Sequence, residues 1–284
     1  MATKAIAARD GAARPLLPFK YLFLSLWSLL VLFPIWTMVA NSFKLKNDIY
    51  LDPFGLPRTW NFAGYATVFE DSPFPRYFLN SLAVTTISLA LIILLGSLAA
   101  YACVRWRSRY SRWIYLFFLA GLTVPIKIGS VNLLQIMISL GLLDSTWSVV
   151  PVYVAMGLPI AVFTLYEFIK GIPVELTEAA LIDGAGPLLI YRSIIVRLVR
   201  PAIATVAIFN LVPIWNDLWF PLIFIRKDDQ RTLILGVTRL FGEYQTDWSK
   251  ILAVLSLSCV PVILLYLGMA KQFISGLTAG AVKG

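Results

Sequence analysis

The sequence contains no histidine and only two cysteines among its 284 residues. Without histidine, the chain lacks the usual general base, the commonest metal ligand and any catalytic triad that contains histidine. Cys103 and Cys259 lie in or beside apolar segments, so neither a disulfide framework nor a cysteine metal site is expected. Paired carboxylates are also missing from the apolar segments, and a membrane enzyme is therefore disfavoured.

Charge is scarce as well. Only 14% of the residues are charged, 59% are hydrophobic and the mean hydropathy is +0.80. A soluble domain usually carries about 25% charged residues, so this composition indicates an integral membrane protein. The net charge of +9 raises the question of nucleic acid, but no basic patch with interleaved aromatic residues occurs on a polar domain. We therefore expect membrane lipid, and no nucleic acid, as a partner.

Six apolar runs are long enough to cross about 30 Å of hydrocarbon. They cover roughly residues 21–40, 77–104, 113–140, 147–168, 201–225 and 251–269. Prolines at positions 34, 125, 159, 213 and 261 interrupt them, which is typical of kinked helices in a packed membrane bundle. We predict an all-α integral membrane protein, a bundle of about six transmembrane helices.

The first run has a rival interpretation, because basic residues precede it as in a cleavable signal peptide. Its apolar stretch is too long for a signal-peptide core, and no convincing cleavage site follows, so we interpret it as an uncleaved anchor. No repeat of fixed period is detectable. We predict an N-terminal cytoplasmic segment over 1–20 and a single membrane domain over 21–284.

Basic residues indicate the orientation. With six spans both termini lie on one side, and that side then holds 14 basic residues against four acidic ones. The basic residues of the opposite side are closely matched by acidic ones. By the positive-inside rule both termini are cytoplasmic, although Lys44 and Lys46 just outside the first span run against it. The cluster Arg105, Arg107, Arg109 and Arg112 is then a topology determinant and a contact for lipid headgroups.

The cytoplasmic loop over about 170–201 predicts two helices. Pro173 suits the first turn of the first helix, and Glu175 and Glu178 complement the dipole in its early turns. Gly184 and Gly186 are expected to end it through left-handed geometry. Pro187 can begin the second helix, which carries Arg192, Arg197 and Arg200 on one face up to Pro201.

The first of these helices has two interpretations. It is either a short interfacial helix on the membrane or a contact for another protein. Its small residues offer little apolar area for lipid but permit close approach of a protein backbone, which favours the protein contact. Those small residues are Ala179, Ala180, Gly184, Ala185 and Gly186.

The run Glu178-Ala179-Ala180, two residues, then Asp183-Gly184-Ala185 closely resembles the EAA loop of ABC importer permeases, and the likeness continues to Pro201. Residues 215–222 (WNDLWFPL) and the tail 276–284 (GLTAGAVKG) resemble the carbohydrate, maltose-type branch. The resemblance covers nearly the whole chain. One departure is Arg197, where the family commonly has proline, and it puts the local kink in doubt.

The resemblance implies the type I importer fold and an ATPase-coupling helix. In this family the EAA helix docks in a groove of a cytoplasmic ATPase subunit, where Glu178 and Asp183 would make polar contacts. Ala179, Ala180, Gly184 and Gly186 would allow the close fit. This chain has no Walker A pattern, so ATP and Mg²⁺ would be used by the partner and no cofactor is expected here.

The resemblance also implies the assembly and its location. We expect a second homologous permease, more readily a different chain than a copy, two cytoplasmic ATPase subunits and a periplasmic solute-binding protein. The complex would import a sugar or sugar derivative across the bacterial cytoplasmic membrane by alternating access. The rival classes are a secondary transporter driven by an ion gradient, which usually shows internal repeats and ionisable relays, and a pure scaffold.

Charged residues within spans suggest where a solute passes. Lys127 and Asp217 are the two candidates, with neutral neighbours and two tryptophans able to stack on sugar rings. These are Asn132, Gln135, Asn210, Asn216, Trp215 and Trp219. The alternative is that Lys127 and Asp217 are solvated or paired near the outer interface, and that both tryptophans serve packing or the interfacial belt.

Overall fold

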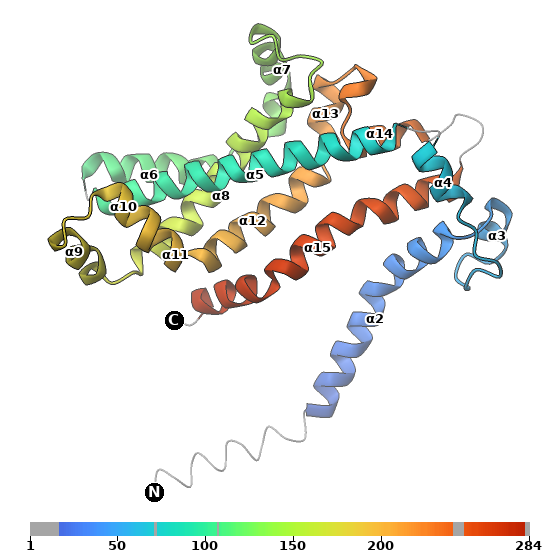
Figure 1. The fold of residues 1–284 in the computed structure, drawn as a ribbon, viewed down its shortest axis with the longest axis horizontal. Coiled ribbons are helices and arrows are strands. Elements are labelled where there is room, and N and C mark those ends of the chain that lie inside the picture. The colour runs from blue at the N-terminus through green and yellow to red at the C-terminus, as the bar shows by residue number, and fades with distance from the viewer. Residues whose placement is uncertain (1–16, 71–72, 107, 241–246, 282–284) are drawn as a thin grey trace, which may run out of the picture. The chain divides into compact units, whose positions relative to one another are not determined.

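A computed structural model describes the backbone of residues 17–70, 73–106, 108–240 and 247–281. Every regular element in these ranges is a helix, as the sequence predicts (Figure 1). Within the described residues, four helices are long and apolar enough to cross a membrane, and the number rises to six if each of two sharply bent helix pairs forms one span. The chain divides into two compact units, one of residues 1–71 and 242–257, the other of residues 72–241 and 258–284.

In the part of the chain that the structure describes, the first unit holds three helices and the start of the last one. These are α2 (Leu17–Ser42), α3 (Lys46–Leu51), α4 (Ala63–Glu70) and the first turns of α15 (Trp248–Ala281). The side chains of residues 18–36 on α2 are all exposed, which suits a helix that faces lipid or another subunit.

The segment after α2 is ordered but irregular. Phe43 lies 5.0 to 5.3 Å, between ring centroids, from Trp60, Phe62 and Tyr65. The ammonium of Lys44, whose side chain is buried, donates a 2.6 Å hydrogen bond to the carbonyl of Asp52. Lys44 therefore has a structural role inside this segment, which explains a basic residue at a place that the charge rule disfavours.

The second unit is a helical bundle. Its long helices are α5 (Phe74–Arg105), α6 (Arg109–Gly121), α7 (Ser130–Ser139), α8 (Val149–Lys170), α12 (Arg200–Trp215) and the part of α15 from Ser258 onward. Its short helices are α9 (Val174–Ile182), α10 (Pro187–Ile190), α11 (Val196–Leu198), α13 (Trp219–Phe224) and α14 (Leu233–Val237). Figure 1 shows α9 and α10 at one end of this unit and α13 and α14 at the other.

Small residues bring α5 and α8 together, and the two helices pack along much of their length. An added Cβ on Gly96 would lie 2.7 Å from Cβ of Ala161, so the two backbones are close at this point. Such close approach is how helices gain dispersion contacts where lipid removes the usual hydrophobic driving force. The fully buried Ile92 and Leu165 fill the same core.

The third and fifth predicted spans are each broken into two helices, where the sequence predicts kinks at prolines. In the third, α6 and the segment Ile126–Ser139 meet at 83°, with Pro125 between them. Proline lacks an amide donor and disfavours helical backbone in the residue before it, so the helix stops here. In the fifth, α12 ends at Trp215, and α13 begins only at Trp219.

Candidate functional site

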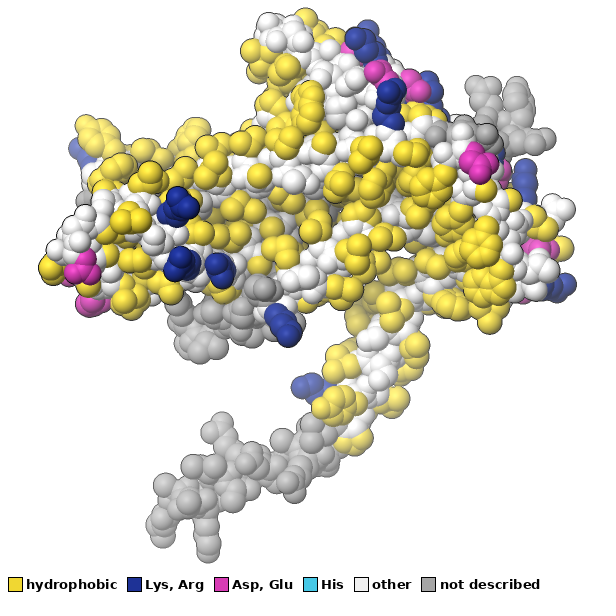
Figure 2. Space-filling view, in the orientation of Figure 1, with side chains coloured by type: hydrophobic (Ala, Val, Ile, Leu, Met, Phe, Trp, Pro, Cys, Tyr) yellow, Lys and Arg dark blue, Asp and Glu magenta, His cyan; other side chains and the backbone are white. Residues whose placement is uncertain are grey.

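The helix α9 forms the first half of the predicted cytoplasmic loop. Pro173 takes the N-cap position, one residue before the predicted place, and Glu175 lies in the first turn, where its charge complements the helix dipole. None of the nine residues of α9 is buried. Most of the surface of α9 is therefore presented to its surroundings, and Figure 2 shows hydrophobic and acidic side chains over this end of the unit.

The end of α9 is built by Gly184. It has φ +82°, and its amide donates to the carbonyl of Leu181 at 3.0 Å, while the amide of Ala185 donates to Ala180 at 2.9 Å. These two bonds form the Schellman motif, which requires left-handed backbone at the position of Gly184. For Gly186 the prediction was wrong: it has φ −73° and caps the start of α10 in extended geometry.

The surface of α9 is mixed, and the expectation that it offers little apolar area was wrong. Val174, Leu176, Leu181 and Ile182 are all exposed, Ile182 by 86%. Yet α9 carries two acidic residues and no basic one, whereas a helix that binds the membrane interface typically has a basic polar face. The combination of apolar and acidic groups favours docking of α9 in a groove of another protein over binding to the membrane interface.

The residues predicted for ATPase coupling divide into two groups. Ala180 is half-buried and packs against the hydrophobic core of its own unit. The side of the loop that faces outward is made by the exposed residues Glu178, Ala179, Asp183, Gly184 and Gly186. Five of the six predicted residues thus share the exposed surface of one short loop.

Behind α9, the second predicted helix forms with an irregularity. A π-helical turn, Tyr191–Ile195, separates α10 from α11. The segment Pro187–Leu198 then meets α12 at 75°, although Arg197 stands where proline is common. The chain therefore keeps a sharp bend here without that proline.

Two tyrosines connect this segment to α5. The hydroxyls of Ser97 and Tyr191 lie 2.7 Å apart, and the hydroxyl of Tyr101 donates to the carbonyl of Pro187 at 3.2 Å. The two tyrosine rings are 5.5 Å apart between centroids. Both contacts lie one turn apart on the same face of α5, so a shift of residues 187–191 acts on this helix directly.

A second candidate site is a cleft of about 510 Å³ bordered by α8, α12 and the break that follows α12. Four of the eight predicted solute-path residues line it: Lys127, Asn210, Asn216 and Asp217. Asn210 is buried and donates to the carbonyl of Val206 at 2.8 Å, whereas Asn216 is exposed.

Asp217 is held by several donors. Its carboxylate accepts hydrogen bonds from the hydroxyl of Tyr153 at 2.9 Å and from the amides of Trp219 and Phe220 at 3.2 and 3.1 Å. Asp217 thus fixes the start of α13 and ties it to α8, in agreement with the structural alternative. Sequence reasoning missed Tyr153, because a tyrosine within an apolar helix carries no local signal of a polar partner.

Lys127, which lines this cleft, forms a pair with Trp219, which is not itself a lining residue. The ammonium lies 5.7 Å from the indole centroid, and the indole N–H donates to the hydroxyl of Ser130 at 2.8 Å. Trp219 remains 44% exposed. An exposed indole held in a fixed orientation beside a cation is suited to a polar ring-shaped solute.

The other predicted path residues lie apart from this cleft. Asn132 borders a separate hollow of about 350 Å³, and Gln135 is exposed on α7. Trp215 is buried, and its indole N–H donates to the carbonyl of Ser258 at 3.0 Å. These contacts give Trp215 a packing role.

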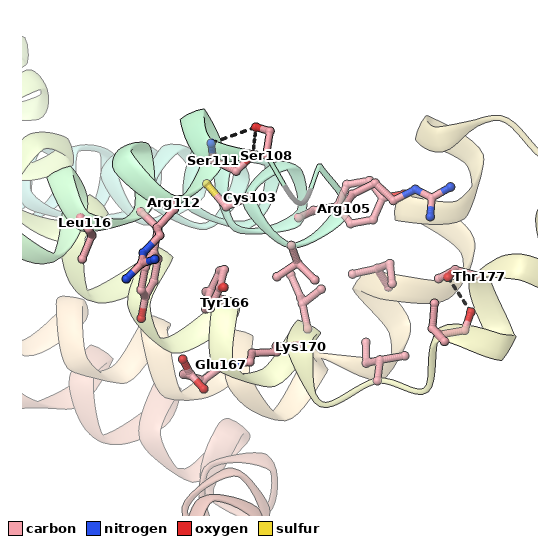
Figure 3. Close-up of a pocket in the computed structure, with 17 residues that line it drawn as sticks. Cys103, Arg105, Ser108, Ser111, Arg112, Leu116, Tyr166, Glu167, Lys170 and Thr177 are labelled. Carbon is pink, nitrogen blue, oxygen red and sulfur yellow. Dashed lines mark hydrogen bonds between the residues drawn. The ribbon is translucent and has the colours of Figure 1, made fainter.

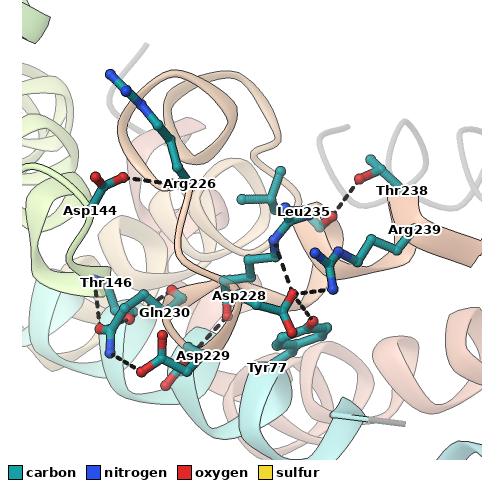
Figure 4. A network of polar contacts seen from close by, with 12 residues as sticks. Tyr77, Asp144, Thr146, Arg226, Asp228, Asp229, Gln230, Leu235, Thr238 and Arg239 are labelled. Carbon is teal, nitrogen blue, oxygen red and sulfur yellow. Dashed lines mark hydrogen bonds and ion pairs between the residues drawn. The ribbon is translucent and has the colours of Figure 1, made fainter.

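At the opposite end of the unit from α9, a polar network orders the segment 226–239 (Figure 4). The hydroxyl of Tyr77 donates to Asp228 at 2.6 Å, and Arg239 pairs with the same carboxylate oxygen at 2.6 Å. Thr146 bonds Gln230 through both its amide and its hydroxyl. This segment is therefore held against both α5 and the start of α8.

Among the described residues, no group of Cys, His, Asp and Glu is placed to hold a metal ion.

Comparisons with known proteins identify the family. The diacetylchitobiose uptake system permease protein NgcG of Streptomyces coelicolor is 33% identical over 282 residues, which cover 99% of this chain and 93% of NgcG. The melibiose/raffinose/stachyose import permease protein MelC of Bacillus subtilis is 31% identical, with 88% of this chain and 91% of MelC covered. The sulfoquinovosyl glycerol transport system permease protein SmoH of Agrobacterium fabrum is 32% identical over 268 residues, 94% of each chain.

A solved bacterial ABC transporter involved in the import of the acidic polysaccharide alginate contains a chain of the same fold. It superposes with a TM-score of 0.79 at 21% identity and covers 92% of this chain and 98% of its own. The model of the family described as binding-protein-dependent transport system inner membrane component matches residues 92–278. The chain therefore belongs to this family, the permease subunits of ABC importers.

Proposed function

We propose that this permease moves a sugar or sugar derivative into the cytoplasm and that α9 couples it to an ATPase subunit. The observation that carries the coupling is the exposed, sharply terminated helix α9, with Glu178, Ala179 and Asp183 on its surface. The names of the relatives support the sugar, since NgcG and MelC are described as carrying diacetylchitobiose and melibiose, raffinose or stachyose.

The solute passes beside the cleft that Lys127, Asn210 and Asp217 line. This permease forms one wall of the solute path. A second homologous permease, which is a different chain, forms the other wall. The exposed indole of Trp219 stacks on the C–H face of a sugar ring at this wall.

This sequence contains no Walker A pattern with which to bind ATP. ATP and Mg²⁺ are therefore used by two ATPase subunits on the cytoplasmic side. Their closure moves the α9 helices together and opens the cavity toward a periplasmic solute-binding protein. Both termini lie in the cytoplasm, as the distribution of basic residues indicates. No observation favours the alternative of transport driven by an ion gradient.

The test is reconstitution. The tagged chain, co-purified with its partners and placed in liposomes with a solute-binding protein, is expected to take up labelled oligosaccharide only when ATP is inside with the ATPase. Uptake that persists without ATP but collapses with the proton gradient would contradict the proposal. A Gly184→Leu variant is expected to lose the ATPase during purification while keeping the second permease, which separates coupling from assembly of the membrane part.

A further inference from the structure

A second and larger cleft, of about 730 Å³, lies at the end of the unit that holds α9 (Figure 3). Its walls come from the end of α5, the start of α6, the end of α8 and the first turn of α9. It shares no lining residue with the cleft around Lys127. The proposed transport path does not use it.

The charged side chains that line this cleft are mostly basic. The charged lining residues are three basic ones, Arg105, Arg112 and Lys170, and one acidic one, Glu167, which leaves an excess of two positive charges. The ion pairs found among the described residues all lie elsewhere, so none of these three cations is neutralised by a carboxylate there. In Figure 3, Arg105 and Arg112 come from the α5–α6 side of the cleft, and Lys170 comes from α8 on the other side.

The depth of the cleft in the membrane follows from its neighbours. The span α5 ends at Arg105, and Trp106, Tyr110 and Trp113 follow with exposures of 67%, 79% and 62%. Exposed tryptophan and tyrosine side chains at the end of a span mark the membrane–water interface. The basic groups of the cleft therefore lie at the level of lipid headgroups.

An apolar surface continues from the cleft along α6. Leu116 belongs to the lining and is 37% exposed, and the neighbouring Ile114 and Phe117 are exposed by 50% and 74%. A molecule with a phosphate in the cleft and hydrocarbon chains beside α6 would satisfy both surfaces. A soluble phosphate compound would use only the charged one.

We propose that this cleft binds the headgroup of an anionic phospholipid, such as phosphatidylglycerol, through Arg105, Arg112 and Lys170. The shared chemistry is a phosphate anion, and the lipid is favoured because the apolar face of α6 adjoins the basic groups. The site borders Val174 and Thr177 of α9, so its occupant lies directly against the helix proposed to couple the ATPase.

The test is native mass spectrometry of the intact importer complex, delipidated in detergent and titrated with phosphatidylglycerol or phosphatidylcholine. The triple variant Arg105→Gln, Arg112→Gln, Lys170→Gln is compared with a control that also loses three exposed basic residues, Arg192→Gln, Arg197→Gln, Arg200→Gln. None of the control residues lines the cleft. Inorganic phosphate and glycerol phosphate are titrated in parallel as soluble probes.

The wild type and the control are each expected to bind one more phosphatidylglycerol molecule than the cleft variant does. The three substitutions in the cleft are expected to weaken the affinity for phosphatidylglycerol at this site roughly 100-fold. Arg112→Gln alone, at an exposed position, is expected to weaken it roughly fivefold and guards against misfolding of the triple variant. Equal losses in the control, or equal binding of phosphatidylcholine, would overturn the site. Equal affinity for inorganic phosphate would assign the cleft to a soluble anion instead.

Discussion

The hydroxyl of Tyr153 donates a 2.9 Å hydrogen bond to Oδ2 of Asp217 and so joins α8 to the break between α12 and α13. A bond to a charged acceptor contributes about 1.5–3 kcal/mol, and Tyr153 is only 2% exposed. We expect Tyr153→Phe to lower the unfolding free energy by about 2 kcal/mol, measured as thermal stability of the purified complex. Tyr110→Phe, at a 79% exposed position, is the control and should change nothing. Identical stability of the two variants would contradict this role.

The two tryptophans near this break are expected to separate stability from transport. Trp215 is 3% exposed, so Trp215→Ala should destabilise the protein by about 3–5 kcal/mol. Trp219 is 44% exposed, and Trp219→Ala should cost much less stability while reducing uptake of labelled oligosaccharide. Thermal stability and uptake, measured for both variants, check the prediction. If Trp219→Ala leaves uptake unchanged, the proposed stacking surface is incorrect.

The left-handed backbone at Gly184 sets the end of α9. A Cβ at this position costs about 1–2 kcal/mol, so Gly184→Ala should loosen the end of the helix and weaken retention of the ATPase during purification. Asparagine tolerates the same backbone region better, and Gly184→Asn should retain more of the ATPase than Gly184→Ala does. The reverse order would show that side-chain size, and not backbone strain, limits this position.

Sequence reasoning predicted the helices and the exposed loop because each depends on local signals. The apolar runs predict where the long helices lie. Pro173 and Gly184 predict where α9 begins and ends, and its observed bounds agree with them closely. The break after Trp215 carried a weaker signal. The run 215–222 is apolar overall, and what stops the helix is Asp217, whose carboxylate accepts amides of α13. The bond from Tyr153 to the same carboxylate joins residues distant in the chain, so the sequence does not reveal it.

The two candidate sites also differ in how far the sequence predicts them. The loop residues Glu178, Ala179 and Gly184 share a surface because they are neighbours in sequence. The cleft joins Lys127, Asn210 and Asp217 from separate helices, and spacing in the sequence does not reveal that Asn132 and Gln135 lie outside it. The placement of α7, which packs against α13, decides that difference, and it depends on contacts distant in the chain.

Asp228 accepts from Tyr77 and pairs with Arg239 and Arg231 at 2.6 and 3.3 Å. We expect Asp228→Ala to release the segment 226–239, since it removes three contacts at once. Amide hydrogen exchange of this segment should rise by roughly fivefold or more, which corresponds to about 1 kcal/mol of lost local stability. Lys227→Ala, an exposed neighbour, is the control. The amide of Asn80 also donates to the carbonyls of Asp229 and Arg231, at 3.0 and 2.9 Å. Unchanged exchange in Asp228→Ala would show that the contacts of Thr146 and Asn80 hold the segment alone.

Gly157 gives α8 room for its neighbours. A Cβ there would lie 2.4 Å from Cδ1 of Ile92 and 2.5 Å from Oδ1 of Asn210. Gly157→Ala should therefore cost about 1–3 kcal/mol through overpacking and reduce thermal stability. Gly268→Ala, with nothing within 4 Å of the new Cβ, is a matched helical control and should be neutral or mildly stabilising. A neutral result at Gly157 would mean that α5 and α8 separate easily.

The helix α5 is continuous over 32 residues, about 48 Å in length, and its proline lies in the first turn. Near one end, Tyr77 and Asn80 hold the segment 226–239, and near the other, Ser97 and Tyr101 contact residues 187–191. An unbroken helix of this length acts as a stiff rod. A displacement that enters at its Arg105 end therefore reaches its Phe74 end without a joint to absorb it, whereas α6–α7 and α11–α12 each contain a sharp break.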